Sequence, residues 1–222
     1  MKSVRPLIYA AILAGTASTA SASDHDIGLN VGSLGIGPQI GWTLSPGNFH
    51  GRLSLGLIDY PESAVAEGIE YDGDLELKNI ALLGDYYPFG GIFRISAGVI
   101  VNDNAFSATG KVDAGDEYTA GGETYTAGAG DTATGEITFD SLAPYIGIGF
   151  GRASSSKGLS FTADLGVMSL GGASASIDIA SRDPALQAEA SRYATSAESA
   201  LEDELDALAL YPVIQVGALY RF

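Results

Sequence analysis

The last stretch of the chain, Tyr211 to Phe222, alternates between two kinds of side chain. One register is apolar or aromatic and holds Ile214, Val216, Ala218, Tyr220 and Phe222, and the other is smaller and more polar. A period of two predicts a β-strand with unlike faces. Apolar residues that end in interfacial aromatics are typical of a strand that faces lipid. An ordinary sandwich strand that ends in Phe is the alternative.

The N-terminus has the three parts of a secretory signal peptide. Lys2 and Arg5 precede a short apolar run from Leu7 to Gly15, and Ala20-Ser21-Ala22 offers a cleavage site. We therefore expect a signal peptide over 1–22, cleaved near Ala22, and one mature domain over 23–222. The apolar run is too short for a transmembrane helix, so a membrane location requires a barrel. The chain has no cysteine, which excludes disulfides and thiolate metal sites.

Six further stretches alternate in the same way and predict strands over 27–31, 34–44, 49–57, 92–102, 144–150 and 159–167. Between the third and fourth of these ranges, one more strand is predicted to end at Tyr86-Tyr87. The parity change across Gly32-Ser33 favours a two-residue hairpin turn with Gly32 at its first central position, and one long bulged strand is the alternative. The turn brings the count to eight strands, an even number, as in single-chain bacterial barrels.

Short turns at 45–48 and 88–91 alternate with long polar segments. The segments 59–76, 103–140 and 178–206 hold 23 of the 27 acidic residues, and the full chain carries a net charge of −16. Within the second, Tyr118 to Tyr125 predicts a small hairpin about Gly121-Gly122. The fold class we predict is all-β, an eight-stranded antiparallel transmembrane outer-membrane barrel with long extracellular loops, the last one partly helical.

The run from Leu142 to Gly151, followed by Phe161 to Gly166, resembles the CarO (carbapenem-associated) family of small outer-membrane barrels. The resemblance extends to Tyr71–Leu75, Tyr118–Tyr125 and the C-terminal strand. It implies an eight-stranded barrel and the uptake of small, often basic solutes such as ornithine.

Four charged residues are predicted to point into the barrel at similar heights: Arg52, Asp85, Arg94 and Asp164. Counting across the 88–91 turn pairs Asp85 with Arg94 and Tyr86 with Phe93. Two interpretations stay open for the ring: a selectivity ring in a pore, or a salt-bridged plug, since an eight-stranded barrel has room for little besides side chains.

The last acidic segment carries a helical pattern. Asp183-Pro184 suits a helix start, and apolar residues then recur every three or four positions. They are Leu186, Ala190, Tyr193, Ala197, Leu201, Leu205 and Leu208. This stripe predicts a helix that needs a cover, and we expect a lid over the barrel mouth, with a partner protein as the alternative.

The chain offers little for enzyme or metal chemistry. Both histidines, His25 and His50, lie toward the periplasmic side of the predicted topology, so we expect no catalytic site. Acidic clusters such as Glu202-Asp203-Glu204 match no calcium-loop spacing, and no cofactor is predicted.

The charge excludes nucleic acid as a partner. We expect outer-membrane lipids and lipopolysaccharide, the barrel-assembly machinery acting through the strand that ends in Phe222, and small basic solutes. The function expected is passage of small cationic solutes across the outer membrane, and the alternative is a closed structural or surface-interaction barrel without pore activity.

Overall fold

The structure is a computed structural model of the whole chain. It describes residues 25–45, 48–66, 69–111, 115, 117–120, 123–126, 128, 132–151, 157–180, 187, 191, 194–195, 198–199, 201–202, 205 and 210–222. The predicted signal peptide lies outside these residues. Within them, no helix has both the length and the apolar character needed to cross a membrane.

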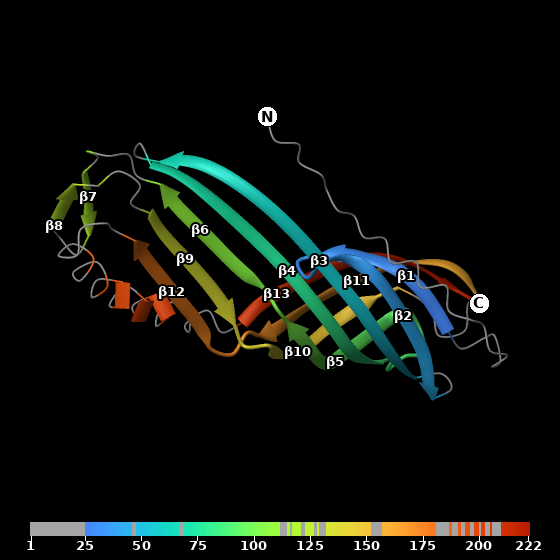
Figure 1. Cartoon of the computed structure of the whole chain (residues 1–222). Helices are drawn as coiled ribbons and strands as arrows, with labels where there is room; N and C mark the ends of the chain where they lie inside the picture. Colours follow the sequence, from blue (N-terminus) through green and yellow to red (C-terminus); the bar gives the residue numbers. More distant parts are fainter. Residues whose placement is uncertain are drawn as a thin grey trace.

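The described residues form thirteen β-strands (Figure 1). In chain order they are β1 (His25–Gly32), β2 (Gly35–Ser45), β3 (Phe49–Ala66), β4 (Ile69–Tyr86), β5 (Phe93–Asn102), β6 (Ala105–Lys111), β7 (Glu117–Ala120), β8 (Glu123–Thr126), β9 (Thr132–Phe139), β10 (Leu142–Phe150), β11 (Gly158–Ser169), β12 (Ala173–Ala180) and β13 (Leu210–Arg221).

Eight of these strands close into an antiparallel ring. The order round the ring is β1, β2, β3, β4, β5, β10, β11 and β13, and β13 pairs with β1. The predicted eight-stranded barrel is therefore confirmed. By the outer-membrane pattern, the end with the β2–β3, β4–β5 and β10–β11 connections and the C-terminus is periplasmic. The other end is extracellular, and it carries the two-residue β1–β2 turn as well as the long connections.

The β3–β4 hairpin continues far beyond the ring. Its two strands pair from Phe49–Tyr86 to Ala66–Ile69 with no break in register. Near the ring β4 pairs with β5, but from Glu70 to Glu76 it pairs with β6, which leads to β9 and β12. This outer part of the sheet consists of the outer halves of β3 and β4 with β6, β9 and β12, and we call it the extracellular sheet (Figure 1).

The extracellular sheet corrects the prediction of long loops. Most of 59–76 and much of 103–140 is strand rather than loop. Acidic and small residues in these segments still alternate with apolar ones, so each strand has one polar and one apolar face. The small hairpin predicted about Gly121-Gly122 is confirmed, because β7 and β8 pair Tyr118 with Tyr125.

The first hairpin turn lies one residue later than predicted. Gly32 pairs with Gly35, so the central turn residues are Ser33 and Leu34 rather than Gly32 and Ser33. Leu34 shares the parity of Ile36 and Ile40, which face outward, but Leu34 itself is only 2% exposed. Gly35 adopts a φ of 108°, which a side chain disfavours, and this glycine lets the chain reverse there.

The register across the β4–β5 turn was also predicted wrongly. Asp85 pairs with Ser96 and Tyr86 with Ile95, not with Arg94 and Phe93. The connection is longer than Pro88 to Gly91, because the strand ends before Tyr87, whose side chain is almost fully buried. Because the aromatic side chain of Tyr87 is buried inside the barrel, Tyr87 does not continue strand β4.

Along the β3–β4 hairpin, the polarity of the two faces reverses. On the outer face, Leu53, Leu55 and Leu57 are followed at the same parity by Asp59. On β4 the same face runs from Leu82 and Ile80 through Lys78 to Glu76 and Asp74. On the inner face, polar side chains give way to Ile58, Leu75 and Leu77. Lipid surrounds the first part and water the second, so the reversal at Leu57 and Lys78 marks the outer membrane boundary.

Candidate functional site

The four predicted interior charges meet inside the barrel. Arg52 Nη1 donates to Asp164 Oδ2 at 3.0 Å, and Arg52 Nη2 donates to Asp85 Oδ1 at 3.1 Å. Arg94 Nη2 lies 2.8 Å from both carboxylate oxygens of Asp164. We call these four residues the charge quartet. Two positive and two negative groups neutralise one another, as burial of ions requires.

The quartet is shielded from water. All four residues are between 2% and 7% exposed. Arg94 Nη1 also donates to the carbonyl of Gly151 at 3.1 Å, and Ser96 Oγ donates to Asp85 Oδ1 at 2.5 Å. The sequence analysis did not single out Ser96, although its parity on β5 already placed it inside.

Glycines on the ring strands make room for these long side chains. A Cβ on Gly149 would lie 2.6 Å from both Arg94 Nε and Asp164 Oδ1. A Cβ on Gly147 or Gly166 would collide with the ring or hydroxyl of Tyr145. The Gly-x-Gly pattern of β10 therefore gives the interior its volume.

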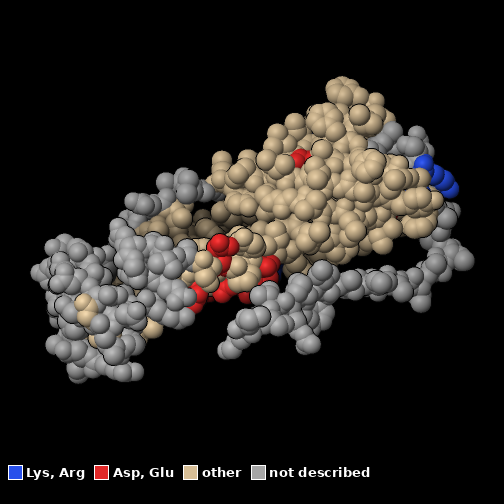
Figure 2. Space-filling view, turned by 90° about the horizontal axis from the view of Figure 1, so that it is seen from above, with Lys and Arg blue, Asp and Glu red and all other residues tan. Residues whose placement is uncertain are grey.

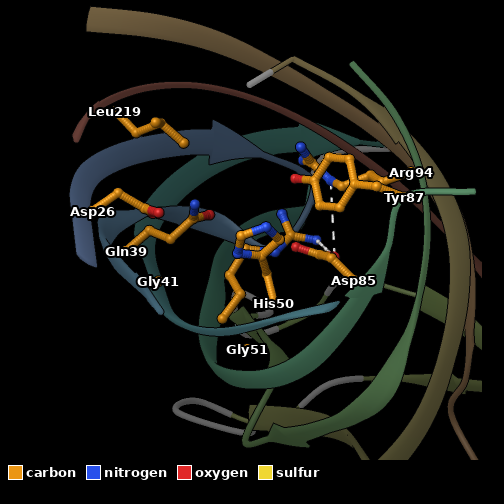
Figure 3. Close-up of a pocket in the computed structure, with 10 residues that line it drawn as sticks. Asp26, Gln39, Gly41, His50, Gly51, Asp85, Tyr87, Arg94 and Leu219 are labelled. Atoms are coloured by element: carbon orange, nitrogen blue, oxygen red, sulfur yellow. Dashed lines mark hydrogen bonds and ion pairs between the residues drawn. The ribbon is translucent and has the colours of Figure 1, made fainter. Parts of the chain in front are cut away.

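On the periplasmic side of the quartet lies a layer of aromatic and polar residues. His50 and Tyr87 pack edge to face with ring centroids 5.1 Å apart. Thr43 Oγ1 lies 3.2 Å from His50 Nδ1 and accepts a hydrogen bond from Arg221 at 3.1 Å. His50, Tyr87, Asp85 and Arg94 border one cavity of about 10 Å³ (Figure 3). That volume is about enough for one water molecule.

An apolar cluster fills the barrel on the extracellular side of the quartet. Its buried members are Leu34, Ala81, Leu83, Ile100, Ala143, Tyr145, Met168, Leu170 and Val213. Ile100 and Met168 are fully buried, and Leu34 enters from the β1–β2 turn. A polar layer covered by an apolar layer leaves no wide aqueous path through the part of the lumen that these residues line.

The extracellular sheet has two unlike faces. One row of paired residues on its inner face runs through Tyr60, Leu75, Phe106 and Ile137. Tyr60 is 57% exposed and Phe106 is 46% exposed, so this apolar row is open to solvent. The next row contains Gly73, Ala108 and Gly135, which leave a shallower strip beside it.

The opposite face is acidic and polar. Asp59 pairs with Glu76, Pro61 with Asp74, and Ser63 donates a hydrogen bond to Asp72 at 2.9 Å. Lys78 forms an ion pair with Glu76. In Figure 2 the acidic side chains gather in a band beside the barrel, whose wall is almost free of charge.

Leu186 and Tyr193 of the predicted lid lie outside the described residues. Leu201 and Leu205 have helical backbone and are half-buried, and Ala194 is buried. Side-chain hydroxyls of Ser191, Thr195 and Ser199 donate to the carbonyl four residues earlier, as helix geometry allows. A continuous helix from Leu186 to Leu208, and its role as a lid, stay predictions.

The described part of this segment contacts strand β12. Glu198 Oε1 accepts from the amide of Ile177 at 2.6 Å, and Glu202 Oε1 accepts from the amide of Ala175 at 2.9 Å. Gln187 Nε2 donates to the carbonyl of Ile179 at 2.8 Å.

Among the described residues, no group of three or more His, Asp or Glu side chains is placed to hold a metal ion. The cluster Glu202-Asp203-Glu204 lies mostly outside them.

Comparison with known proteins places the fold. No protein-family model matches the chain, and no curated protein matches it. The chain is similar to the crystal structure of CarO from Acinetobacter baumannii, with a TM-score of 0.58 and 22% identity over 89% of this chain and 97% of that chain. It is also similar to CarO2 from Acinetobacter baumannii, with a TM-score of 0.60 and 20% identity over 90% of this chain and 99% of that chain. A major outer membrane protein from Thermus thermophilus matches with a TM-score of 0.40 and 16% identity over 89% of this chain and 99% of that chain.

The closed ring and its apolar outer wall define an outer-membrane β-barrel. Within that class, the fold is similar to that of the two CarO structures. The resemblance inferred from Leu142 to Gly151 and from the C-terminal strand is therefore confirmed at the level of fold.

Proposed function

We propose that the protein is a closed outer-membrane barrel that anchors the extracellular sheet and displays it at the cell surface for interaction with other molecules. The filled lumen is the observation that carries this proposal. The quartet is neutral and at most 7% exposed, and Ile100, Met168 and Val213 are at most 1% exposed above it.

The extracellular sheet supports the same proposal. About half of the length of the β3–β4 hairpin lies outside the ring. There it forms part of the extracellular sheet, which has an exposed apolar row on one face and acidic residues on the other. Exposed apolar residues such as Tyr60 and Phe106, contiguous on one sheet, are typical of interaction surfaces. Since the part in the membrane is filled, the surface available for function lies outside it.

Conductance tests the proposal directly. The mature protein, refolded and inserted into planar bilayers, should give no current steps above a protein-free bilayer. An Asp85→Asn/Arg94→Ala variant keeps the Arg52–Asp164 ion pair and removes one of the two arginine side chains of the layer, so current steps in this variant alone would show that the quartet layer blocks the path. Steady steps in the unmodified protein would overturn the closed barrel.

Passage of small cations is a second candidate, and a specific observation favours it. Asp59, Glu76 and Asp103 surround Lys78 at the membrane boundary, so the rim of the barrel is strongly negative. Such a rim raises the local concentration of cations within a Debye length of about 8 Å at physiological salt. For cations to pass, the side chains of the quartet would have to move apart, and the quartet would then form the narrowest part of the pore.

Uptake by liposomes separates the two candidates. If the barrel passes cations, ornithine or lysine should enter faster than glutamate, with a preference that shrinks as salt rises. Deletion of 185–206 should increase the flux if that segment is a lid. Uptake equal to that of empty liposomes, with and without the deletion, would leave the closed barrel.

The partners proposed for the membrane part are those expected from its surface. Lipid and lipopolysaccharide contact the apolar wall, and the assembly machinery recognises β13 with its terminal Phe222. Tyr220 and Phe222 pack edge to face at 5.2 Å and stand on the outer surface. Removal of Phe222 should therefore slow insertion in cells while refolding into detergent micelles stays efficient.

A further inference from the structure

Strand β12 forms one edge of the extracellular sheet among the strands that the structure describes. It pairs with β9 through Ala173 to Ala180. An edge strand exposes amide and carbonyl groups that can pair with another chain, and proteins usually protect such edges.

Here the edge is covered by side chains rather than by a strand. The outward amides of Ala175 and Ile177 donate to the carboxylates of Glu202 and Glu198, and the outward carbonyl of Ile179 accepts from Gln187. These three groups belong to alternate residues of β12, which are the residues whose backbone points away from β9.

The spacing of the two glutamates fits the spacing of the two amides. Glu198 and Glu202 are four residues apart with helical backbone, and such residues lie about 6 Å apart along a helix. Ala175 and Ile177 are two residues apart in a strand, which gives about 6.6 Å. Two carboxylates one helical turn apart therefore match the separation of the two edge amides. They occupy the positions at which a neighbouring strand would place its carbonyl oxygens.

We propose that Glu198 and Glu202 cap the β12 edge and keep it from pairing with the β12 strand of a second copy of this chain. The edge suits a second copy because it is self-complementary. When Ile177 faces Ile177 of the other copy, Ala175 faces Ile179, and all three outward groups pair. Asp178 then lies opposite Ser176, so two like charges do not meet. The inference goes beyond the proposed function and does not depend on whether the lumen conducts.

Hydrogen exchange tests the capping contacts. In a Glu198→Ala/Glu202→Ala variant, the amides of Ala175 and Ile177 should exchange at least about fivefold faster, because each loses its acceptor. A Glu198→Gln/Glu202→Gln variant retains an acceptor oxygen at each position and should keep most of the protection. An Asp59→Ala/Asp74→Ala variant removes the same charge elsewhere on the sheet and should leave both amides unchanged. Equal exchange in the alanine variant and the unmodified protein would overturn the capping role.

Cross-linking tests the second copy. The chain has no cysteine, so Ile177→Cys gives a single thiol at the proposed two-fold axis. Facing residues in an antiparallel pair have Cα atoms about 5.5 Å apart, within disulfide range. Oxidation should give cross-linked dimers when Ile177→Cys is combined with the alanine variant, and at least about tenfold fewer with the glutamates present. Faster exchange without cross-linked dimers would refute the second copy as the occupant of the edge.

Discussion

Removal of Arg94 gives the sharpest test of how the lumen is held. In an Arg94→Ala variant, Asp85 and Asp164 remain with Arg52 as their one partner in the quartet, and a net negative charge is left in the interior. Removal of one partner from a buried ion pair typically costs about 3–5 kcal/mol of folding free energy. Arg52 still contacts both carboxylates at 3.0 to 3.2 Å, so we expect a loss of about 3 kcal/mol, at the lower end of that range.

The geometry also predicts which second change restores stability. With Arg94 absent, Asp85→Asn leaves the Arg52–Asp164 pair, which has two hydrogen bonds at 3.0 and 3.2 Å. Asp164→Asn instead leaves Arg52 with Asp85 through a single hydrogen bond at 3.1 Å. Both double variants are neutral, but Asp85→Asn should recover at least about 1.5 kcal/mol and Asp164→Asn should recover less.

Urea unfolding in detergent micelles measures these differences. Trp42 is the one tryptophan of the chain and reports unfolding by fluorescence, and gel mobility before and after boiling gives a second measurement. Purely additive effects of Arg94→Ala and Asp85→Asn would contradict an ion pair network. A loss below about 1 kcal/mol for Arg94→Ala would show that the quartet is hydrated.

Three further outcomes follow from the fold. The purified mature protein should have a far-UV spectrum dominated by β-structure and should migrate differently before and after boiling; a helix-dominated spectrum would contradict the barrel. Gly149→Ala places a methyl group 2.6 Å from atoms of two quartet side chains, so it should lower the free energy of unfolding in urea by about 1–3 kcal/mol. The control Gly135→Ala has no atom within 4 Å of the new Cβ and should change that free energy by less than about 0.5 kcal/mol. Leu82→Arg on the lipid face should cost about 2–4 kcal/mol, while Asp74→Arg on the same face of β4 beyond the boundary should stay within about 0.5 kcal/mol; equal losses would contradict the boundary.

The ring of eight strands could be predicted from the sequence because the pattern of side chains along each barrel strand is visible without knowledge of its neighbours. Each one alternates between lipid and lumen, and a residue such as Arg94 or Asp164 among outward Phe and Leu shows which parity faces inside. Parity alone brought together Arg52, Asp85, Arg94 and Asp164, although they come from four different strands.

Details of register were not accessible in the same way. The β4–β5 connection depends on where Tyr87 lies, and nothing local distinguishes an aromatic residue that ends a strand from one that folds into the interior. Leu34 presents the same difficulty, since its parity matches Ile36 but its place in the turn sends it into the apolar cluster. Both residues are fixed by packing against strands distant in the sequence.

The extracellular sheet was missed for a different reason, which the sequence itself could have corrected. Acidic residues in 59–76 suggested a solvated loop, yet Asp59 follows Leu53, Leu55 and Leu57 at the same parity, and Leu75 and Leu77 hold the parity of Asp85. A loop has no reason to preserve a period of two across a change of polarity, whereas a strand that leaves lipid for water must exchange its outer leucines for acids. The inner face changes in the opposite sense, because beyond the ring it no longer encloses the quartet and can pack apolar residues of β6 and β9. The β3–β4 hairpin is therefore surrounded by lipid along one half and by water along the other. Its acidic residues mark where the two strands leave the membrane rather than where they end.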